Sequence, residues 1–291
     1  MSNSRNPILR LASWSAHALP APVKKGLYKV PFLARFLRRS LNRAAPQGIH
    51  AVDISGGILE GLRMALDLQS EKDYWLGTYE VDLQAAARHF IQPGMTVYDV
   101  GANIGYISLM AARLNGPEGQ VFSFEALPAN LERLEQNRAL NQLETRIHIQ
   151  PSAVVDQSKP VTFFMHHSGA MGKAQGSAGR EEAYEQQIEV NGLALDDFIY
   201  QQGQPLPGLV KMDIEGGEGM ALAGMARVLK EAPPIFLIEL HGEQAARSVW
   251  EQLDANGYSL HRMQPGYARI DALDQLDWKA YVVALPPGAS L

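Results

Sequence analysis

Residues 97–106 read VYDVGANIGY, a short apolar strand that runs into a glycine-bearing turn and then into a helix. Glycine lets a backbone pass close to a ligand, because it has no Cβ atom to collide with. The N-terminus of the helix that follows offers free N–H groups to a carboxylate or a phosphate. The stretch therefore predicts a ligand-binding strand–turn–helix unit, and the alternative is an ordinary turn that binds nothing.

A carboxylate follows at the distance that a nucleotide-binding fold requires. Glu125 comes directly after the strand-like run VFSF at 121–124, 20 residues beyond Gly105. One helix and one strand fill such an interval, and an acidic residue at the end of the second strand can accept both hydroxyls of a ribose. The sequence therefore predicts a nucleoside cofactor.

The turn favours a cofactor other than a dinucleotide. Dinucleotide-binding dehydrogenases have the fingerprint G-x-G-x-x-G, whereas three residues separate Gly101 from Gly105 and no third glycine completes the pattern. Asp99, just before the turn, would repel a phosphate but could hold an ammonium group through the turn amides or water. A cofactor with an amino-acid end and a ribose end fits better, and S-adenosylmethionine is the candidate.

Two further strands also end in polar residues. The first is LVKMDIEGGE at 209–218, which ends in an acidic turn, and the second is IFLIELH at 235–241. With the glycine turn, FEALPANLERLEQN at 124–137 and LDDF at 195–198, they resemble the FkbM family of S-adenosylmethionine-dependent methyltransferases. Methyltransferase turns often have glycine where this chain has Asn103, and asparagine tolerates the left-handed conformation.

The resemblance implies a class I methyltransferase fold, and the pattern of elements agrees. Alternating strands and helices predict an α/β fold with a doubly wound, mostly parallel, seven-stranded, Rossmann-like sheet, in which ligands gather at the carboxyl ends of the strands. The catalytic domain is expected over residues 51–291, with a β-hairpin from 160–165 and 186–191. The sheet strands are expected at 97–100, 121–125, 146–150, 208–213, 235–240, 258–263 and 280–284.

Each residue expected at the cofactor also has a structural alternative. Glu80 lies in a Gly-x-Tyr-Glu segment that the family shares and is expected at the amino-acid end, or else it is an acid favoured by a helix N-terminus. Residues 152–154 are expected beside the adenine, or else they are core. The full cofactor-binding set is Glu80, Asp99, Gly101, Ala102, Asn103, Gly105, Glu125, Ala126, Ser152, Ala153 and Asp213.

The acidic turn admits three uses. A carboxylate or a histidine could remove the proton of an acceptor hydroxyl, and the residues expected to be catalytic are Asp213, His241 and Lys211. A divalent metal is not expected, although Asp213, Glu215 and Glu239 are weak candidates to hold one. The acids could instead cap a helix that starts near Gly217. Methyl transfer needs in-line alignment above all, so positioning could matter more than any base.

The expected activity is O-methylation of a hydroxyl on a small molecule, a lipid or a glycan. The alternatives are an N-methyltransferase and a non-catalytic binding or scaffold protein that retains the fold. The intact GANIG turn, Glu125 and KMDIEGGE disfavour loss of activity. The absence of cysteine excludes disulfides and suits a reducing compartment. No apolar run is long enough to span a membrane, so a cytoplasmic protein is expected.

The first 50 residues form a basic extension that is expected to be helical. They hold nine of the 26 Lys and Arg residues and none of the 31 Asp and Glu residues. Apolar residues are interleaved with the basic ones over residues 24–43, as in an interfacial helix. Three uses remain open: packing on the catalytic domain or on a second subunit of a homo-oligomer, peripheral membrane contact, and nucleic-acid binding, which no motif supports.

Overall fold

The computed structural model describes residues 47–166, 172–178, 184–277 and 279–291. They form two compact units, one comprising residues 47–81 and 139–141 and the other the remaining described residues. Most of the basic extension lies outside the described residues. The predicted domain boundary at residue 50 therefore stays a prediction.

The smaller unit is built on an antiparallel pair of strands. β1 (Ile49–Asp53) pairs with β2 (Arg63–Asp67), and the short helix α4 (Lys72–Leu76) follows. The side chain of Asn141 binds the backbone of Arg63 twice, accepting from its N–H over 2.9 Å and donating to its carbonyl over 2.7 Å. This pair of hydrogen bonds ties residues 139–141 to the strands.

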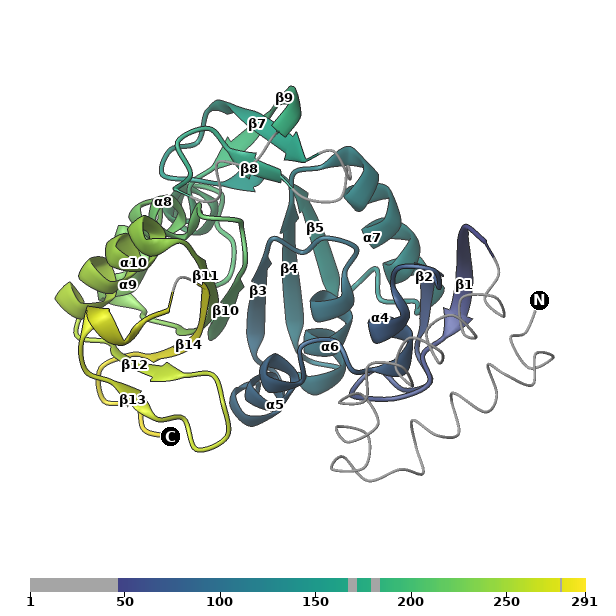
Figure 1. The fold of residues 1–291 in the computed structure, drawn as a ribbon, viewed down its shortest axis with the longest axis horizontal. Helices are drawn as coiled ribbons and strands as arrows, with labels where there is room; N and C mark the ends of the chain where they lie inside the picture. Colours follow the sequence, from purple (N-terminus) through teal and green to yellow (C-terminus); the bar gives the residue numbers. More distant parts are fainter. Residues whose placement is uncertain (1–46, 167–171, 179–183, 278) are drawn as a thin grey trace, which may run out of the picture. The chain divides into compact units, whose positions relative to one another are not determined.

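The larger unit contains an eight-stranded sheet in the order β13-β12-β14-β11-β10-β3-β4-β5 (Figure 1). The central strands β5, β4, β3, β10 and β11 pair in parallel, and β14 runs antiparallel to both of its neighbours. The mostly parallel, doubly wound sheet is thus confirmed, and its seven predicted strands are all present. The two-residue edge strand β13 is an eighth that the sequence did not predict. The strands are β3 (Thr96–Val100), β4 (Gln120–Glu125), β5 (Ile147–Pro151), β10 (Leu209–Met212), β11 (Ile235–His241), β12 (Ser259–Arg262), β13 (Arg269–Ile270) and β14 (Lys279–Leu285).

Helices cover both faces of this sheet. On one face, Ser108 of α6 contacts the side chains of Asp99 and Ser123, which project from β3 and β4. On the other face, alternate strand residues such as Tyr98 and Phe124 share a buried cluster with α8 and α10. Alternation of side chains along each strand separates the two layers. The helices are α5 (Val81–Phe90), α6 (Tyr106–Leu114), α7 (Pro128–Leu140), α8 (Glu218–Ala223), α9 (Ala226–Glu231) and α10 (Glu243–Ala255).

The helix that was expected to start near Gly217 is α8, which ends at Ala223, and α9 begins a new helix two residues after Gly224. A Cβ atom on Gly224 would collide with the Val155 carbonyl oxygen, so only glycine allows this close approach. The Asp196 carboxylate then begins α9 by accepting hydrogen bonds from two consecutive N–H groups, over 2.8 and 3.0 Å. Val155 and Asp196, which cause the break, both lie far from Gly224 in sequence.

A small sheet in the order β6-β9-β7-β8 stands beside the carboxyl ends of β4 and β5 (Figure 1). The antiparallel pairing of β7 with β9 confirms the predicted hairpin. Phe163 of β7 is buried in one cluster with Ala126, Leu127 and Ala153, which follow β4 and β5. The strands are β6 (Ala153–Val154), β7 (Pro160–His166), β8 (Gly172–Ala174) and β9 (Tyr184–Leu193).

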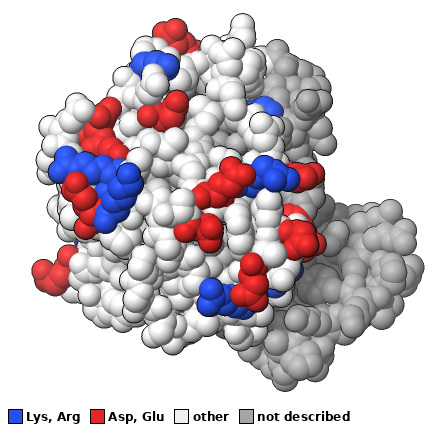
Figure 2. Space-filling model, turned by 90° about the vertical axis from the view of Figure 1, so that its left-hand side faces the viewer, with Lys and Arg blue, Asp and Glu red and all other residues white. Residues whose placement is uncertain are grey.

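The described surface and helices bear on whether this part of the chain contains a membrane-spanning element. On the face that Figure 2 shows, acidic and basic side chains lie beside one another, and no large area carries a single sign. Exposed ion pairs such as Arg227–Glu231 on α9, with 2.9 Å between nitrogen and oxygen, fit this mixture. Among the helices that the structure describes, none is long and apolar enough to cross a bilayer.

Candidate functional site

The glycine turn between β3 and α6 is built against the acidic turn that follows β10. Gly101 has a φ of +78°, and a Cβ atom there would collide with the carbonyl oxygen of Asp213. The N–H groups of Gly101 and Ala102 both donate to the Phe124 carbonyl oxygen, over 3.0 and 2.9 Å. The turn therefore joins the carboxyl ends of three strands, and Gly105 closes it at the start of α6.

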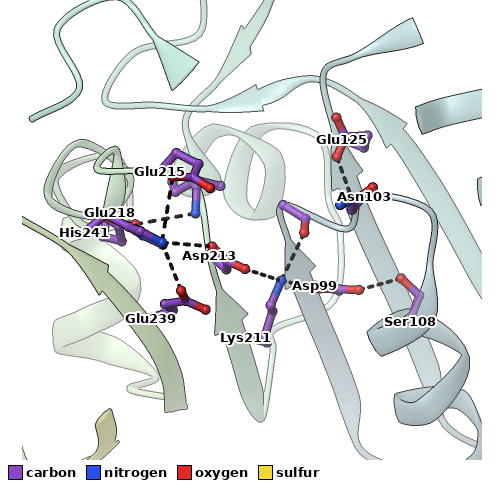
Figure 3. Close-up of polar contacts among 12 residues, drawn as sticks. Asp99, Asn103, Ser108, Glu125, Lys211, Asp213, Glu215, Glu218, Glu239 and His241 are labelled. Carbon is purple, nitrogen blue, oxygen red and sulfur yellow. Dashed lines mark hydrogen bonds and ion pairs between the residues drawn. The ribbon is translucent and has the colours of Figure 1, made fainter. Parts of the chain in front are cut away.

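Glu125 is aimed back at this turn. Asn103 has a φ of +49°, which confirms that it takes the left-handed conformation, and its N–H donates to Oε2 of Glu125 over 2.8 Å (Figure 3). The other carboxylate oxygen accepts from the N–H groups of Ala126 and Leu127, over 3.0 and 2.8 Å. Burial raises the pKa of Glu125, and these backbone hydrogen bonds oppose that effect.

Small side chains stand at the neighbouring strand ends. Ala126 and Ala153 are buried, and Ser152 precedes Ala153 at the junction of β5 and β6. A carboxylate beside the glycine turn, next to small apolar side chains, has the chemistry that a nucleoside needs: an acceptor for the ribose diol and a flat apolar wall. These residues therefore fit the adenosine part of the expected cofactor, although their roles stay predictions.

Polar side chains continue beneath the turn. Asp99 is fully buried; its Oδ2 accepts a hydrogen bond from Ser108 over 2.6 Å, and its Oδ1 lies 3.5 Å from Nζ of Lys211. Lys211 also donates to the Gly101 carbonyl oxygen over 3.0 Å. Sequence reasoning missed Ser108, although its place on the first turns of the helix after the glycine turn was a usable signal. The expected role of Asp99 toward an ammonium group stays a prediction.

The carboxyl ends of β10 and β11 bring four carboxylates around one imidazole (Figure 3). The Nε2 atom of His241 lies 3.0 Å from Glu239, and 3.8 Å from both Asp213 and Glu215. Its Nδ1 atom lies 3.1 Å from the buried Glu218. The side chains of Asp213 and Glu215 are 24% and 25% exposed, so these two carboxylates are the solvent-facing members of the cluster.

The acidic and basic side chains of this cluster stabilise one another in their charged forms. Burial disfavours a charged His241, but the hydrogen bonds with Glu218 and Glu239 outweigh it and raise the pKa of His241 to about 10. Burial likewise opposes a charged Glu239, yet its bonds with His241 and Lys279 lower the pKa of Glu239 to about 2. A protonated His241 cannot accept a proton at neutral pH, so Asp213 and Glu215 are the better candidates for a base.

Three of these groups also meet the geometry of a metal site. Asp213, Glu239 and His241 offer ligand atoms within 4.8 Å of one another. A metal would have to displace a proton from His241, whose pKa is raised, and to compete with Lys279 for Glu239, since these two side chains already form a very close ion pair. These groups already form an ion-paired cluster, and the expectation that no metal binds here stays a prediction. The sequence did not predict a role for Lys279, because only the pairing of β14 with β11 brings it opposite His241.

Glu80 belongs to the smaller unit and also has a left-handed backbone, with a φ of +44°. That conformation is unfavourable for a residue other than glycine or asparagine, and such strain gathers at functional sites. Its expected contact with the amino-acid end of the cofactor stays a prediction.

Comparison with known proteins connects this geometry to a family. Residues 99–260, more than half of the chain, match the family described as the Methyltransferase FkbM domain. The 31-O-demethyl-FK506 methyltransferase FkbM of Streptomyces tacrolimicus is 28% identical over 161 residues. That alignment covers 46% of this chain and 61% of the relative, so the chain spans less than two thirds of the relative's length.

The solved structures that resemble this chain have lower sequence identity to it. A methyltransferase FkbM from Methylobacillus flagellatus KT is 17% identical with a TM-score of 0.41, and the match covers 75% of this chain and 53% of that chain. An S-adenosylmethionine-dependent O-methyltransferase from Thermotoga maritima is 13% identical with a TM-score of 0.41, over 87% of this chain and 80% of that chain.

Proposed function

The chain belongs to the FkbM methyltransferase family, and on this basis we propose that it transfers the methyl group of S-adenosylmethionine to a hydroxyl of an acceptor molecule. One arrangement carries the proposal: Glu125 is directed at a glycine turn by the Asn103 N–H. The curated relative is an O-methyltransferase by name, which favours oxygen over nitrogen as the acceptor atom. A non-catalytic role is disfavoured by the complete set of polar residues at the strand ends.

The cofactor would be held by the turn and by the residues after β4 and β5. Its ribose diol would share the Glu125 carboxylate with the backbone N–H groups, and its adenine would lie against Ala126, Ser152 and Ala153. When bound, S-adenosylmethionine supplies an electrophilic methyl group on a sulfonium. Exclusion of water and alignment of the acceptor oxygen would then be the main tasks of the protein.

Asp213 is the residue best placed to act on the acceptor. Asp213 follows β10, its backbone carbonyl oxygen lies against Gly101 of the glycine turn, and its carboxylate is partly exposed. As a carboxylate it could accept the proton of the acceptor hydroxyl, or orient that hydroxyl by a hydrogen bond. His241 would serve as a charged neighbour of Asp213, because both of its ring nitrogens already face carboxylates.

The decisive experiment combines calorimetry with methyl transfer. Wild-type protein should bind S-adenosylhomocysteine and ignore NAD, and should transfer label from S-adenosylmethionine to a member of a panel of hydroxyl and amine acceptors. Asp213→Asn should keep cofactor affinity and lose about 10²–10⁴-fold in turnover if it is a base. Excess chelator should leave transfer unchanged. Binding of NAD with no response to either sulfur nucleoside would overturn the proposal.

A further inference from the structure

The buried ammonium group of Lys211 lies close to both parts of the proposed site, namely the glycine turn and the acidic turn that contains Asp213. The side chain of Lys211 is 7% exposed, and its Nζ donates to the Gly101 carbonyl oxygen over 3.0 Å. The same Nζ lies 3.5 Å from Oδ1 of Asp99 and 3.9 Å from Oδ2 of Asp213. Figure 3 shows Lys211 between the glycine turn and the acidic cluster.

Strand pairing fixes the ammonium group in this place. β3 and β10 pair in parallel with Lys211 directly opposite Asp99, and Asp99 stands opposite Ser123 of β4. Ser108 of α6 covers this row, with its Oγ 2.6 Å from Asp99 and 2.8 Å from Ser123. Oδ1 of Asp99 is buried and has no hydrogen-bond partner among the described residues, so the ion pair with Lys211 is what compensates its charge.

We propose that Lys211 is a positioning residue that couples the cofactor turn to Asp213. This inference rests on the proposed methyl transfer and assigns Lys211 a role other than contact with the reacting atoms, because its side chain is buried. Holding the Gly101 carbonyl fixes the peptide that begins the turn, and with it the direction of the N–H groups that follow. The same ammonium group attracts the Asp213 carboxylate, so that the position of Asp213 relative to the glycine turn stays fixed.

A simpler role competes with this one, namely neutralisation of the buried Asp99. Removing Lys211 alone cannot separate the two, because an uncompensated buried carboxylate is strongly destabilising. A charge-balanced comparison can separate them. In Asp99→Asn the ammonium group keeps its bond to Gly101, whereas in Asp99→Asn/Lys211→Met both charges are gone and the Gly101 carbonyl loses its donor. Any contribution of Asp99 itself cancels between the two variants.

The affinity for S-adenosylhomocysteine and the rate of methyl transfer are measured for both variants, with folding checked by circular dichroism and thermal unfolding. Coupling predicts that the double variant binds at least tenfold more weakly than Asp99→Asn and turns over at least tenfold more slowly, at similar acceptor KM. Equal affinity and turnover in the two variants would overturn it and leave neutralisation as the role of Lys211. Failure of the wild type to bind the nucleoside would instead overturn the proposed function.

Lys211→Arg supplies a second test if the double variant does not fold. Arginine preserves the charge beside Asp99, but its longer, planar donor group cannot occupy the position of Nζ. Coupling predicts a folded protein that has lost at least tenfold in turnover and in affinity for S-adenosylhomocysteine. Wild-type values in Lys211→Arg would contradict the positioning role, since charge alone would then suffice.

Discussion

The imidazole of His241 and the carboxylate of Glu218 form a buried pair, with 3.1 Å between Nδ1 and Oε1. The other ring nitrogen lies 3.0 Å from Glu239. Both nitrogens can donate only when the ring is protonated, and these bonds raise the pKa of His241 to about 10 against the opposing effect of burial. His241 is thus a fixed cation that holds acids from two strand ends together.

This arrangement predicts a specific dependence of stability on pH. The pKa of His241 is higher in the folded protein than the ~6.5 of an unfolded chain, so its contribution is complete below about pH 6.5. That contribution should disappear as the pH rises through about 10. Wild-type protein should therefore lose up to ~5 kcal/mol of unfolding free energy over that window, and His241→Asn should lack this loss. Urea denaturation at a series of pH values measures it, and parallel curves for the two proteins would contradict it.

Glu125 should control cofactor affinity through its charge. Glu125→Gln keeps an oxygen that can accept from the Asn103 N–H but removes the charge-assisted hydrogen bonds to a ribose, so we expect affinity for S-adenosylhomocysteine to fall by about 1–3 kcal/mol. Glu135→Gln is the matched control, because this carboxylate on α7 is exposed and pairs only with Arg138 among the contacts found for it. Calorimetry on both variants decides, and an equal change in the two would remove Glu125 from the cofactor site.

The backbone of Glu215 provides a test that separates stability from activity. Glu215 has a φ of +53°, and Gln142, exposed and remote in sequence from the site, has a φ of +55°. Asparagine tolerates this conformation better than either residue, so Gln142→Asn should raise stability by about 0.5–1 kcal/mol and leave turnover unchanged. Glu215→Asn relieves the same strain but loses a partly exposed carboxylate beside His241.

If Glu215 contacts the acceptor, Glu215→Asn should lower kcat/KM for the acceptor at least tenfold while affinity for S-adenosylhomocysteine stays constant. Thermal unfolding and steady-state kinetics of Gln142→Asn and Glu215→Asn test whether Glu215 contacts the acceptor. Full activity in Glu215→Asn would assign the residue to the structure of the turn alone.

Local patterns predicted the parts of the fold that depend on neighbours in sequence. Seven strands of the main sheet and the left-handed Asn103 follow from turn chemistry and from alternation along a strand. The features that the sequence did not predict depend on residues that come into contact only after folding. Gly224 breaks a helix because Val155 lies against it, and Lys279 reaches Glu239 because β14 pairs with β11. Periodicity within one segment carries no information about such partners.

The basic extension gives the last prediction, and it rests on sequence because residues 1–46 lie outside the described part. Seven basic residues are interleaved with apolar residues in the sequence 24–43, and each could contribute about 1 kcal/mol of attraction to an anionic surface. A single amphipathic helix without a lipid anchor binds weakly and reversibly. The full chain should therefore co-sediment with anionic vesicles at low salt better than a chain that starts at His50.

The competing role is packing on the protein itself or on a second subunit, and matched conditions distinguish the two. Replacement of Lys24, Lys25 and Lys29 by glutamine removes charge but keeps the apolar residues, so membrane attraction predicts reduced sedimentation with anionic vesicles and no change with neutral ones. The effect should fade with added salt, because screening weakens surface attraction. Equal sedimentation of the full and shortened chains, together with a large loss of thermal stability on shortening, would assign the extension to packing.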